Sequence, residues 1–127
     1  DTNWRSSPGM VESVNALFSC MDTAFMFREI PFQPVQFAEK NASLRFEFNG
    51  ETQPAMRFWL LDGEGCGVAD YQNAMAQHCA AQIRDWLSAG ARGEAVLWKG
   101  QDALPVKASD ITVLVRSRQE AALIREP

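Results

Sequence analysis

The spacing of apolar residues changes several times along the chain between helical and extended values, which predicts a mixture of helices and strands. The longest helical pattern covers residues 70–88, where apolar side chains form one stripe, polar side chains form the other face, and Gly90 or Gly93 ends the helix. A shorter helix is expected to begin at residues 7–8, because serine followed by proline is a helix-start signal. A third helix is expected over residues 119–126.

Several short stretches have the patterns of strands instead. Residues 44–48 alternate apolar and charged side chains, which predicts a strand with one buried and one wet face, and the Asn-Gly pair after them supplies turn chemistry. A second strand is expected over residues 55–61. Residues 95–98 and 104–107 flank a Gly-Gln-Asp stretch, and this arrangement predicts a β-hairpin.

The run at residues 111–115 is rich in β-branched residues and is expected to be the most buried strand. Such runs are typical of strands covered on both faces in the parallel sheet of an α/β domain. Residues 21–41 lose all periodicity, and we expect an irregular packed connection held to the core through Phe25, Phe27 and Phe32. The predicted fold is therefore α/β, with a mainly parallel sheet flanked by helices and an added β-hairpin.

Composition and charge narrow the class of protein. The chain has 127 residues, of which 46% are hydrophobic and 22% charged, as in ordinary globular proteins. A chain of this length forms one domain at most. Its formal net charge of -4 gives no general attraction for nucleic acid, which proteins bind by neutralising phosphates with basic groups. Any contact with DNA is therefore expected to be local and weak.

The three cysteines, Cys20, Cys66 and Cys79, are odd in number and widely spaced, which fits neither a disulfide framework nor a zinc site. A reduced, cytoplasmic setting fits them best. The sequence has no signal peptide and no apolar run of the roughly 18 residues that span a bilayer, so no membrane association is expected. The chain starts without Met and ends just after a helical pattern begins, so we expect an excised piece of a longer protein.

Some chemistries are excluded by the residue inventory. His78 is the single histidine, so neither a Ser-His-Asp triad nor a cluster of histidines around a metal can form within the chain. We expect His78 on a helix surface and no metal ligands. The glycines at 63, 65 and 67 lack the preceding strand and following lysine of a phosphate-binding loop, and they indicate a turn. The isolated chain is therefore not expected to bind ATP tightly.

Two arginines occupy positions suited to an anionic ligand. Arg5 and Arg116 each follow a predicted extended segment and precede a predicted helix. Ligands of open α/β sheets bind beyond the carboxyl ends of the strands, and the free amides at a helix start favour phosphate. The alternative is that both arginines are surface residues in structural salt bridges.

Residues 2–7, Thr-Asn-Trp-Arg-Ser-Ser before a helix, resemble the Q-N-[YF]-R-S-[TS] motif of superfamily 1 DNA helicases of the UvrD type. Residues 111–117, with Gln119, resemble a later segment of the same domain, in which an apolar strand ends in Arg-Ser or Arg-Thr and enters a helix. The elements between them also match, so the resemblance covers essentially the whole chain. The chain departs from the motif at Thr2, where glutamine is usual, and at Ser7, where threonine is usual.

The resemblance implies a partial RecA-like lobe of the P-loop NTPase type, the second of two motor lobes that share ATP and Mg²⁺. The first lobe would supply the phosphate-binding loop, its lysine and the magnesium carboxylates. By position, Arg5 matches the family arginine that reaches the γ-phosphate as an arginine finger. Trp4 matches the aromatic residue that packs on the adenine ring, and its alternative role is core packing.

By the same resemblance, Arg116, Ser117 and Arg118 lie where relatives approach the backbone of the translocating DNA strand, and the alternative is an ordinary surface role. The implied parent protein is an ATP-dependent DNA helicase with a nuclease that processes double-strand breaks with partner subunits. The rival interpretations are a UvrD-like repair helicase without a nuclease and a non-enzymatic docking module. The chain alone is expected to be inactive and to bind no cofactor. Because the truncation exposes apolar surface, we also expect self-association or marginal stability.

Overall fold

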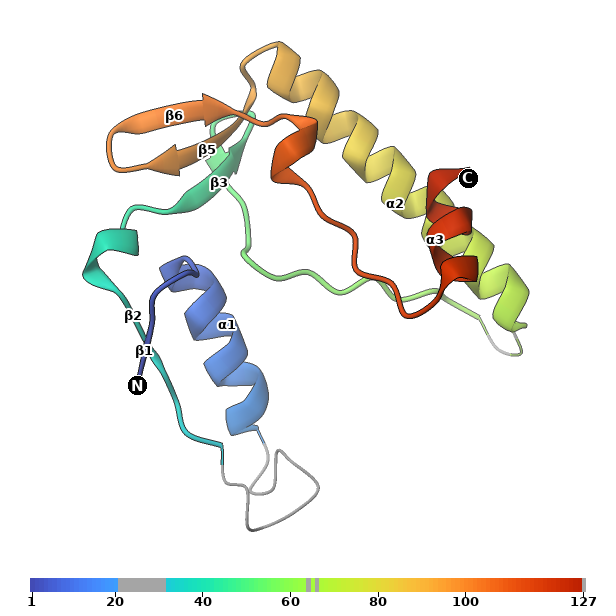
Figure 1. Ribbon diagram of the computed structural model, residues 1–127, viewed down its shortest axis with the longest axis horizontal. Helices are drawn as coiled ribbons and strands as arrows, with labels where there is room; N and C mark the ends of the chain where they lie inside the picture. Colours follow the sequence, from blue (N-terminus) through green and yellow to red (C-terminus); the bar gives the residue numbers. More distant parts are fainter. Residues whose placement is uncertain (21–31, 64, 66, 127) are drawn as a thin grey trace. The chain divides into compact units, whose positions relative to one another are not determined.

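A computed structural model describes residues 1–20, 32–63, 65 and 67–126 (Figure 1). The chain divides into two compact units, one of Asp1–Arg57 with Val96–Leu104 and the other of Phe58–Ala95 with Pro105–Pro127. The helices in the described residues are α1 Pro8–Ser19, α2 Val68–Ala91 and α3 Arg118–Arg125, with short 3-10 helices η1 Glu39–Asn41 and η2 Ala108–Asp110. The strands are β1 Thr2–Asn3, β2 Gln36–Phe37, β3 Arg45–Phe48, β4 Glu51–Thr52, β5 Ala95–Lys99 and β6 Asp102–Pro105.

A short pair of parallel strands forms the start of the first unit. β1 pairs with β2 in a register that sets Asn3 opposite Phe37. The following helix, α1, is tied to the residues before β2 by the side chain of Asn15. Its Nδ2 donates to the carbonyl of Val35 at 2.7 Å, and its Oδ1 accepts from the amide of Val35 at 3.0 Å. These paired bonds fix the helix beside the short parallel pair.

The strand predicted at residues 44–48 forms as β3, and its turn has the predicted chemistry. Asn49 and Gly50 have positive φ angles of 54° and 81°, the backbone of a two-residue turn between antiparallel strands. β4 pairs with β3 but is only two residues long. The strand expected over residues 55–61 is wrong, because the ladder stops before Pro54, which has no amide hydrogen to extend it.

The predicted β-hairpin forms as β5 and β6, and it extends the sheet in the order β4-β3-β5-β6. All four residues of β3 are half-buried, so its polar face is less wet than predicted. Arg45 covers this face: its guanidinium lies 4.6 Å from the ring centroid of Trp98, and its Nε contacts Glu47 Oε1 at 3.0 Å. The hydrogen bond from Arg45 holds the pKa of Glu47 below its usual value.

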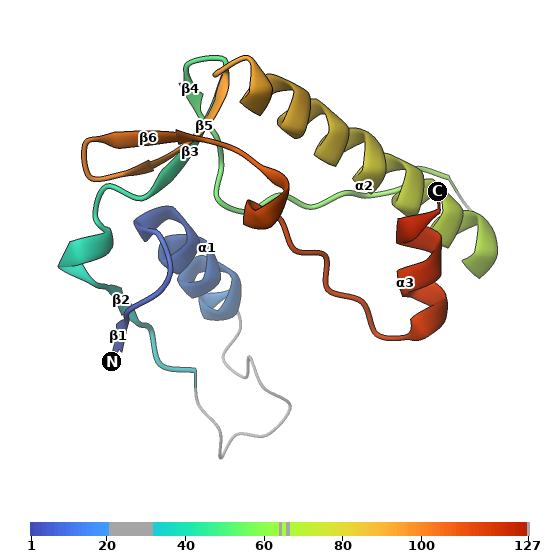
Figure 2. The same cartoon turned by 45° about the horizontal axis from the view of Figure 1, so that its top comes forward.

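Helices dominate the second unit. α2 contains the helix predicted at residues 70–88, and Gly93, with a φ of 75°, follows its end. The predicted carboxyl-terminal helix forms as α3, which lies beside the amino-terminal half of α2 in both views (Figures 1 and 2). Among the described residues of this unit, the buried apolar ones are small or medium-sized, namely Ala76, Ala89, Ala95 and Val106. Larger apolar side chains of α2, such as Ile83, Trp86 and Leu87, are half-buried.

The mainly parallel sheet that the sequence predicts is wrong. Among the described residues, parallel pairing is confined to β1 and β2, and the four-stranded sheet is antiparallel. Residues 111–115, expected to be the most buried strand, form no strand, and Leu114 is 92% exposed. A β-branched run gives a segment the capacity to pair, but a strand also needs a hydrogen-bonded neighbour. No strand in the described part of the chain pairs with this segment.

The connection expected to be irregular is described only from residue 32 onward, and there it contains β2 and η1. Phe25 and Phe27, two of its expected anchors, lie outside the described residues. Phe32 does pack against the first unit, since its ring stacks on Phe18 with centroids 5.3 Å apart. Separately, none of the helices in the described ranges is long and apolar enough to cross a membrane.

Candidate functional site

Trp4 and Arg5 lie in a tight turn between β1 and α1. The side chain of Asn3 builds this turn, because its Oδ1 accepts hydrogen bonds from the amides of Arg5 and Ser6, each at 2.9 Å. Its Nδ2 also donates to Ser6 Oγ at 3.3 Å. Asparagine favours such turns because its side chain can take the place of a backbone acceptor. The turn presents two successive side chains, Trp4 and Arg5, to solvent.

The first turn of α1 follows at once and makes this corner electropositive. The helix starts where the sequence predicts: Ser7 Oγ accepts from the amide of Met10 at 3.2 Å, and Pro8 occupies the first helical position. The free amides of a helix start carry partial positive charge. Arg5 adds a full positive charge two positions before the capping serine. The corner is therefore suited to an anionic group such as phosphate.

The two exposed side chains of this corner have few competing contacts. Trp4 is 65% exposed, so it does not pack in the core of the described chain. Lys40 places its Nζ 5.8 Å from the centroid of this ring. The guanidinium of Arg5 is exposed and makes no ion pair with any residue in the described ranges. An open aromatic face next to an unpaired planar cation can stack on a base and bind a phosphate.

The second candidate corner, at Arg116, is held by an internal ion pair. Ser117 caps α3, since its Oγ accepts from the amide of Glu120 at 3.2 Å. The carboxylate of Glu120 accepts from the amide of Arg116 at 2.8 Å and from its guanidinium at 3.1 Å. These contacts hold the pKa of Glu120 below its usual value, and the hydrogen bond from the amide of Arg116 has the largest effect.

Arg116 thus has the structural salt bridge that the alternative interpretation expects, and Arg5 does not. The expectation that Arg116 follows a strand is wrong, because residues 111–115 are unpaired. Arg118, in the first turn of α3, is exposed and makes no ion pair with a described residue. The Trp4–Arg5 corner belongs to the first unit, and the corner of residues 116–118 belongs to the second.

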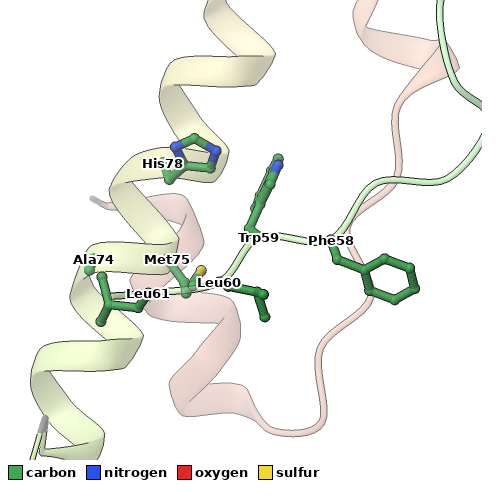
Figure 3. Close-up of a pocket in the computed structure, with 7 residues that line it drawn as sticks. All are labelled: Phe58, Trp59, Leu60, Leu61, Ala74, Met75 and His78. Atoms are coloured by element: carbon green, nitrogen blue, oxygen red, sulfur yellow. The ribbon is translucent and has the colours of Figure 1, made fainter. Parts of the chain in front are cut away.

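An apolar cavity of about 400 Å³ in the second unit was not predicted from the sequence. It is lined by Phe58, Trp59, Leu60, Leu61, Ala74, Met75 and His78 (Figure 3). Trp59 meets the ring of His78 edge-on, with centroids 4.2 Å apart and planes at 86°. His78 is an exposed residue of α2, as predicted, and its contact with Trp59 was not predicted from the sequence. The lining can hold apolar groups, but it contains no carboxylate, amine or thiol.

The sequence signal for this cavity is the run of four large apolar residues at positions 58–61, which lies within the predicted strand of residues 55–61. Exposure alternates along the run, from 69% at Phe58 and 38% at Trp59 to 87% at Leu60 and 42% at Leu61. Such alternation places every second side chain on one face, as in a strand. Within the described residues, no group of three His, Cys, Asp or Glu side chains is placed to hold a metal ion.

Comparison with curated proteins identifies a relative that matches almost the whole chain, a subunit of a multi-subunit enzyme. That subunit is RecB of the RecBCD enzyme, and the chain is homologous to one segment of it. Identity to RecB of Escherichia coli strain K12 is 72% over 99% of the chain. It is 36% over 99% of the chain for RecB of Buchnera aphidicola subsp. Schizaphis graminum, and 35% over 97% for RecB of Haemophilus influenzae.

The chain corresponds to only a small part of these relatives. It spans 11% of the Escherichia coli and Buchnera proteins and 10% of the Haemophilus protein. No protein-family model matches the chain. The resemblance first drawn from residues 2–7 and 111–117 is thereby confirmed as homology with RecB over nearly every residue of this chain.

Proposed function

We propose that the chain is a segment of the second, RecA-like motor lobe of an ATP-dependent DNA helicase and exonuclease subunit that acts in double-strand break repair and recombination. Homology with RecB supports this proposal and favours it over a UvrD-like repair helicase or a docking module. The observation that carries it is the exposed Trp4–Arg5 corner at the start of α1, at the position of the helicase motif. Without the first lobe, the chain is inactive.

In this proposal the Trp4–Arg5 corner is the lid side of an ATP site shared with the first lobe. The residues fit a nucleotide: the open indole offers a stacking face, and the unpaired guanidinium and helix start attract phosphate. Bound ATP supplies the γ-phosphoryl group that is transferred to water. Arg5 neutralises the charge that develops on the phosphoryl oxygens during transfer. Magnesium ligands are assigned to the first lobe, since the described residues offer no carboxylate cluster.

The test is the ATPase activity of the full-length parent protein, with and without single-stranded DNA, before and after Arg5→Ala. An arginine finger acts in the transition state, so kcat should fall by about 10³- to 10⁵-fold. Equilibrium binding of ATP should change much less, because the contact is strongest in the transition state.

Arg84→Ala is the matched control, because Arg84 is an exposed arginine on α2 with only a long ion pair to Asp85, at 3.8 Å. It removes the same charge without touching the corner and should leave kcat unchanged. Unchanged turnover in Arg5→Ala would refute the assignment of Arg5 and leave it a structural corner residue.

We further propose that Arg116, Ser117 and Arg118 contact the phosphate backbone of the translocated DNA strand. The exposure of Arg118 and the cap at Ser117 support this role, since free amides at a helix start also bind phosphate. Replacing Arg118 by alanine should weaken binding of single-stranded DNA equally for all sequences. It should also reduce the slope of log K against log salt by about 0.7, the value for one contact to a single strand. An unchanged slope would assign Arg118 to an ordinary surface role.

The partners in this proposal are DNA, as single strands and duplex ends, and the gamma and alpha subunits of exodeoxyribonuclease V. The relatives are RecB subunits of the RecBCD enzyme, which supports association with other subunits. Copurification of the tagged full-length parent with both subunits tests it. Recovery of the parent alone, under conditions where the other subunits are present and folded, would argue against it.

A further inference from the structure

Among the described residues, Lys40 is the one charged side chain that lies over the exposed ring of Trp4. Its Nζ lies 5.8 Å from the ring centroid. This distance is within the limit of about 6 Å at which an ammonium group is attracted to the face of an indole. Lys40 forms no ion pair with another described residue, so its electrostatic partner in the described chain is the indole of Trp4.

The backbone around Lys40 is held in place for this contact. Lys40 is the middle residue of η1, between Ala38 and Asn41, which are 2% and 7% exposed. The amide of Ala38 donates to the carbonyl of Asn3 at 3.1 Å and so extends the β1–β2 pairing to the residue before Trp4. The amide of Asn41 donates back to the carbonyl of Ala38 at 2.8 Å and closes the turn.

The backbone of Trp4 is fixed from the other side. The turn built by Asn3 holds the two residues that follow Trp4 through hydrogen bonds of 2.9 Å. With both backbones held, the remaining freedom lies in the two side chains. A cation over the ring restricts the rotamers of the indole, while the ring as a whole stays 65% exposed and open to a second planar group.

We propose that Lys40 is a positioning residue that holds the indole of Trp4 in orientation for stacking on a nucleotide base. This inference rests on the proposed role of Trp4 in the ATP site. Restricting the ring before binding reduces the ordering cost of binding, and removing that restriction weakens binding without changing the chemical step. The contribution of an exposed cation–π contact corresponds to a factor of about two to five in affinity.

The experiment uses the full-length parent protein with Lys40→Met, which keeps the length of the side chain and removes the charge. The dissociation constant for ADP, measured by calorimetry, and KM for ATP should both rise about two- to fivefold, with kcat unchanged. Lys40→Arg should restore both values, because a guanidinium also binds an indole face. Lys99→Met, at an exposed lysine at the end of β5, is the control and should change neither.

A second readout needs no nucleotide. In parent protein labelled with 5-fluorotryptophan, the ¹⁹F resonance that disappears in Trp4→Phe belongs to Trp4. It should shift in Lys40→Met and return towards its original position in Lys40→Arg. A resonance that does not move in Lys40→Met would overturn the inference, because the cation would then have no influence on the ring.

Failure of this inference can be told apart from failure of the proposed function by the same measurements on Trp4→Ala. If Trp4→Ala weakens ADP binding and Lys40→Met does not, the ATP-site role of Trp4 stands and the inference is overturned. If Lys40→Met weakens binding equally with and without Trp4, Lys40 acts independently of the ring and the inference is again overturned. If Trp4→Ala leaves ADP binding unchanged, the proposed role of Trp4 fails and the inference fails with it.

Discussion

Gly90→Ala sets helix propensity against steric fit, and the structure indicates which effect prevails. Gly90 is buried inside α2, where alanine would ordinarily stabilise the helix by about 1 kcal/mol. A Cβ atom at this position would overlap the backbone oxygen of Val106 and lie 3.1 Å from its carbonyl carbon. The contact is with backbone, which cannot turn aside as a flexible side chain can.

Val106 has little room to retreat from this overlap. Its amide donates to the carbonyl of Ala95 at 2.9 Å, and the two residues are 7% and 0% exposed. Overpacking of this kind costs about 3 kcal/mol at the upper end of its usual range. Subtracting the gain in propensity leaves a net destabilisation of about 2 kcal/mol. For a domain of this size, that corresponds to a fall in Tm of about 6–8 °C.

The assay is urea denaturation of the 127-residue chain, followed by far-UV circular dichroism, for wild type and Gly90→Ala. Ala91→Gly is the matched control, because Ala91 is exposed at the next position of the same helix. It should lose up to about 1 kcal/mol through propensity alone. A Gly90→Ala chain as stable as wild type, or more stable, would refute the steric reasoning, since propensity would then be the only effect at work.

Three further predictions concern helix caps, pH and association. Ser7→Ala removes the acceptor for the amide of Met10 and should lower the free energy of unfolding by about 1 kcal/mol in the same urea assay; no change would show that the cap is dispensable. The pKa of Glu120 is lowered in the folded chain, so its contribution to stability is present above the ordinary value of 4.5 and is lost as pH falls through the folded value. In Glu120→Gln, the free energy of unfolding should therefore fall less steeply on the acid side of its pH profile. An unaltered profile would show that the contacts of Glu120 with Arg116 do not contribute to stability. Leu60 and Leu114 are 87% and 92% exposed, so the double variant Leu60→Lys, Leu114→Lys should reduce self-association of the isolated chain, measured by light scattering. A wild-type chain that is monomeric at all concentrations would contradict this prediction.

Signals confined to neighbouring residues predicted local structure well. The serine–proline pair starts α1, the Asn-Gly pair turns the chain after β3, and the apolar period of residues 70–88 lies within α2. Each of these features depends on contacts over only a few positions. Their physical causes, a cap, two positive φ angles and an apolar stripe, are therefore present in the sequence itself.

Pairing between distant segments could not be predicted in the same way. Residues 58–61 and 111–115 have the side-chain pattern of strands but are not hydrogen-bonded as strands in the described chain. In the first segment exposure alternates from residue to residue, but all four side chains are apolar, so the sequence did not indicate which of them would be more covered. A ladder of hydrogen bonds also requires a partner strand at the right place, and a one-dimensional pattern carries no information about that partner.

The same limit applies to the candidate site. Trp4 and Arg5 could be proposed as site residues because they are adjacent in a recognisable motif. Lys40 was not, because its contact with Trp4 depends on the pairing of β1 with β2, which brings together segments far apart in the sequence. The apolar cavity beside α2 was missed for a similar reason, since it forms only where residues 58–61 meet the helix.

Arg5 and Arg116 show how one sequence signal can lead to different chemistry. Both were expected after a strand and before a helix, yet only Arg5 follows a paired strand, and only Arg116 meets a carboxylate four residues ahead. An ion pair at the surface is weak, so the Glu120 carboxylate does not prevent Arg116 from reaching a phosphate. A phosphate bound at Arg116 would lie beside the negative charge of Glu120, which would oppose binding. Arg5 has no such competitor in the described chain, and its positive charge is available to a ligand without the loss of an existing contact.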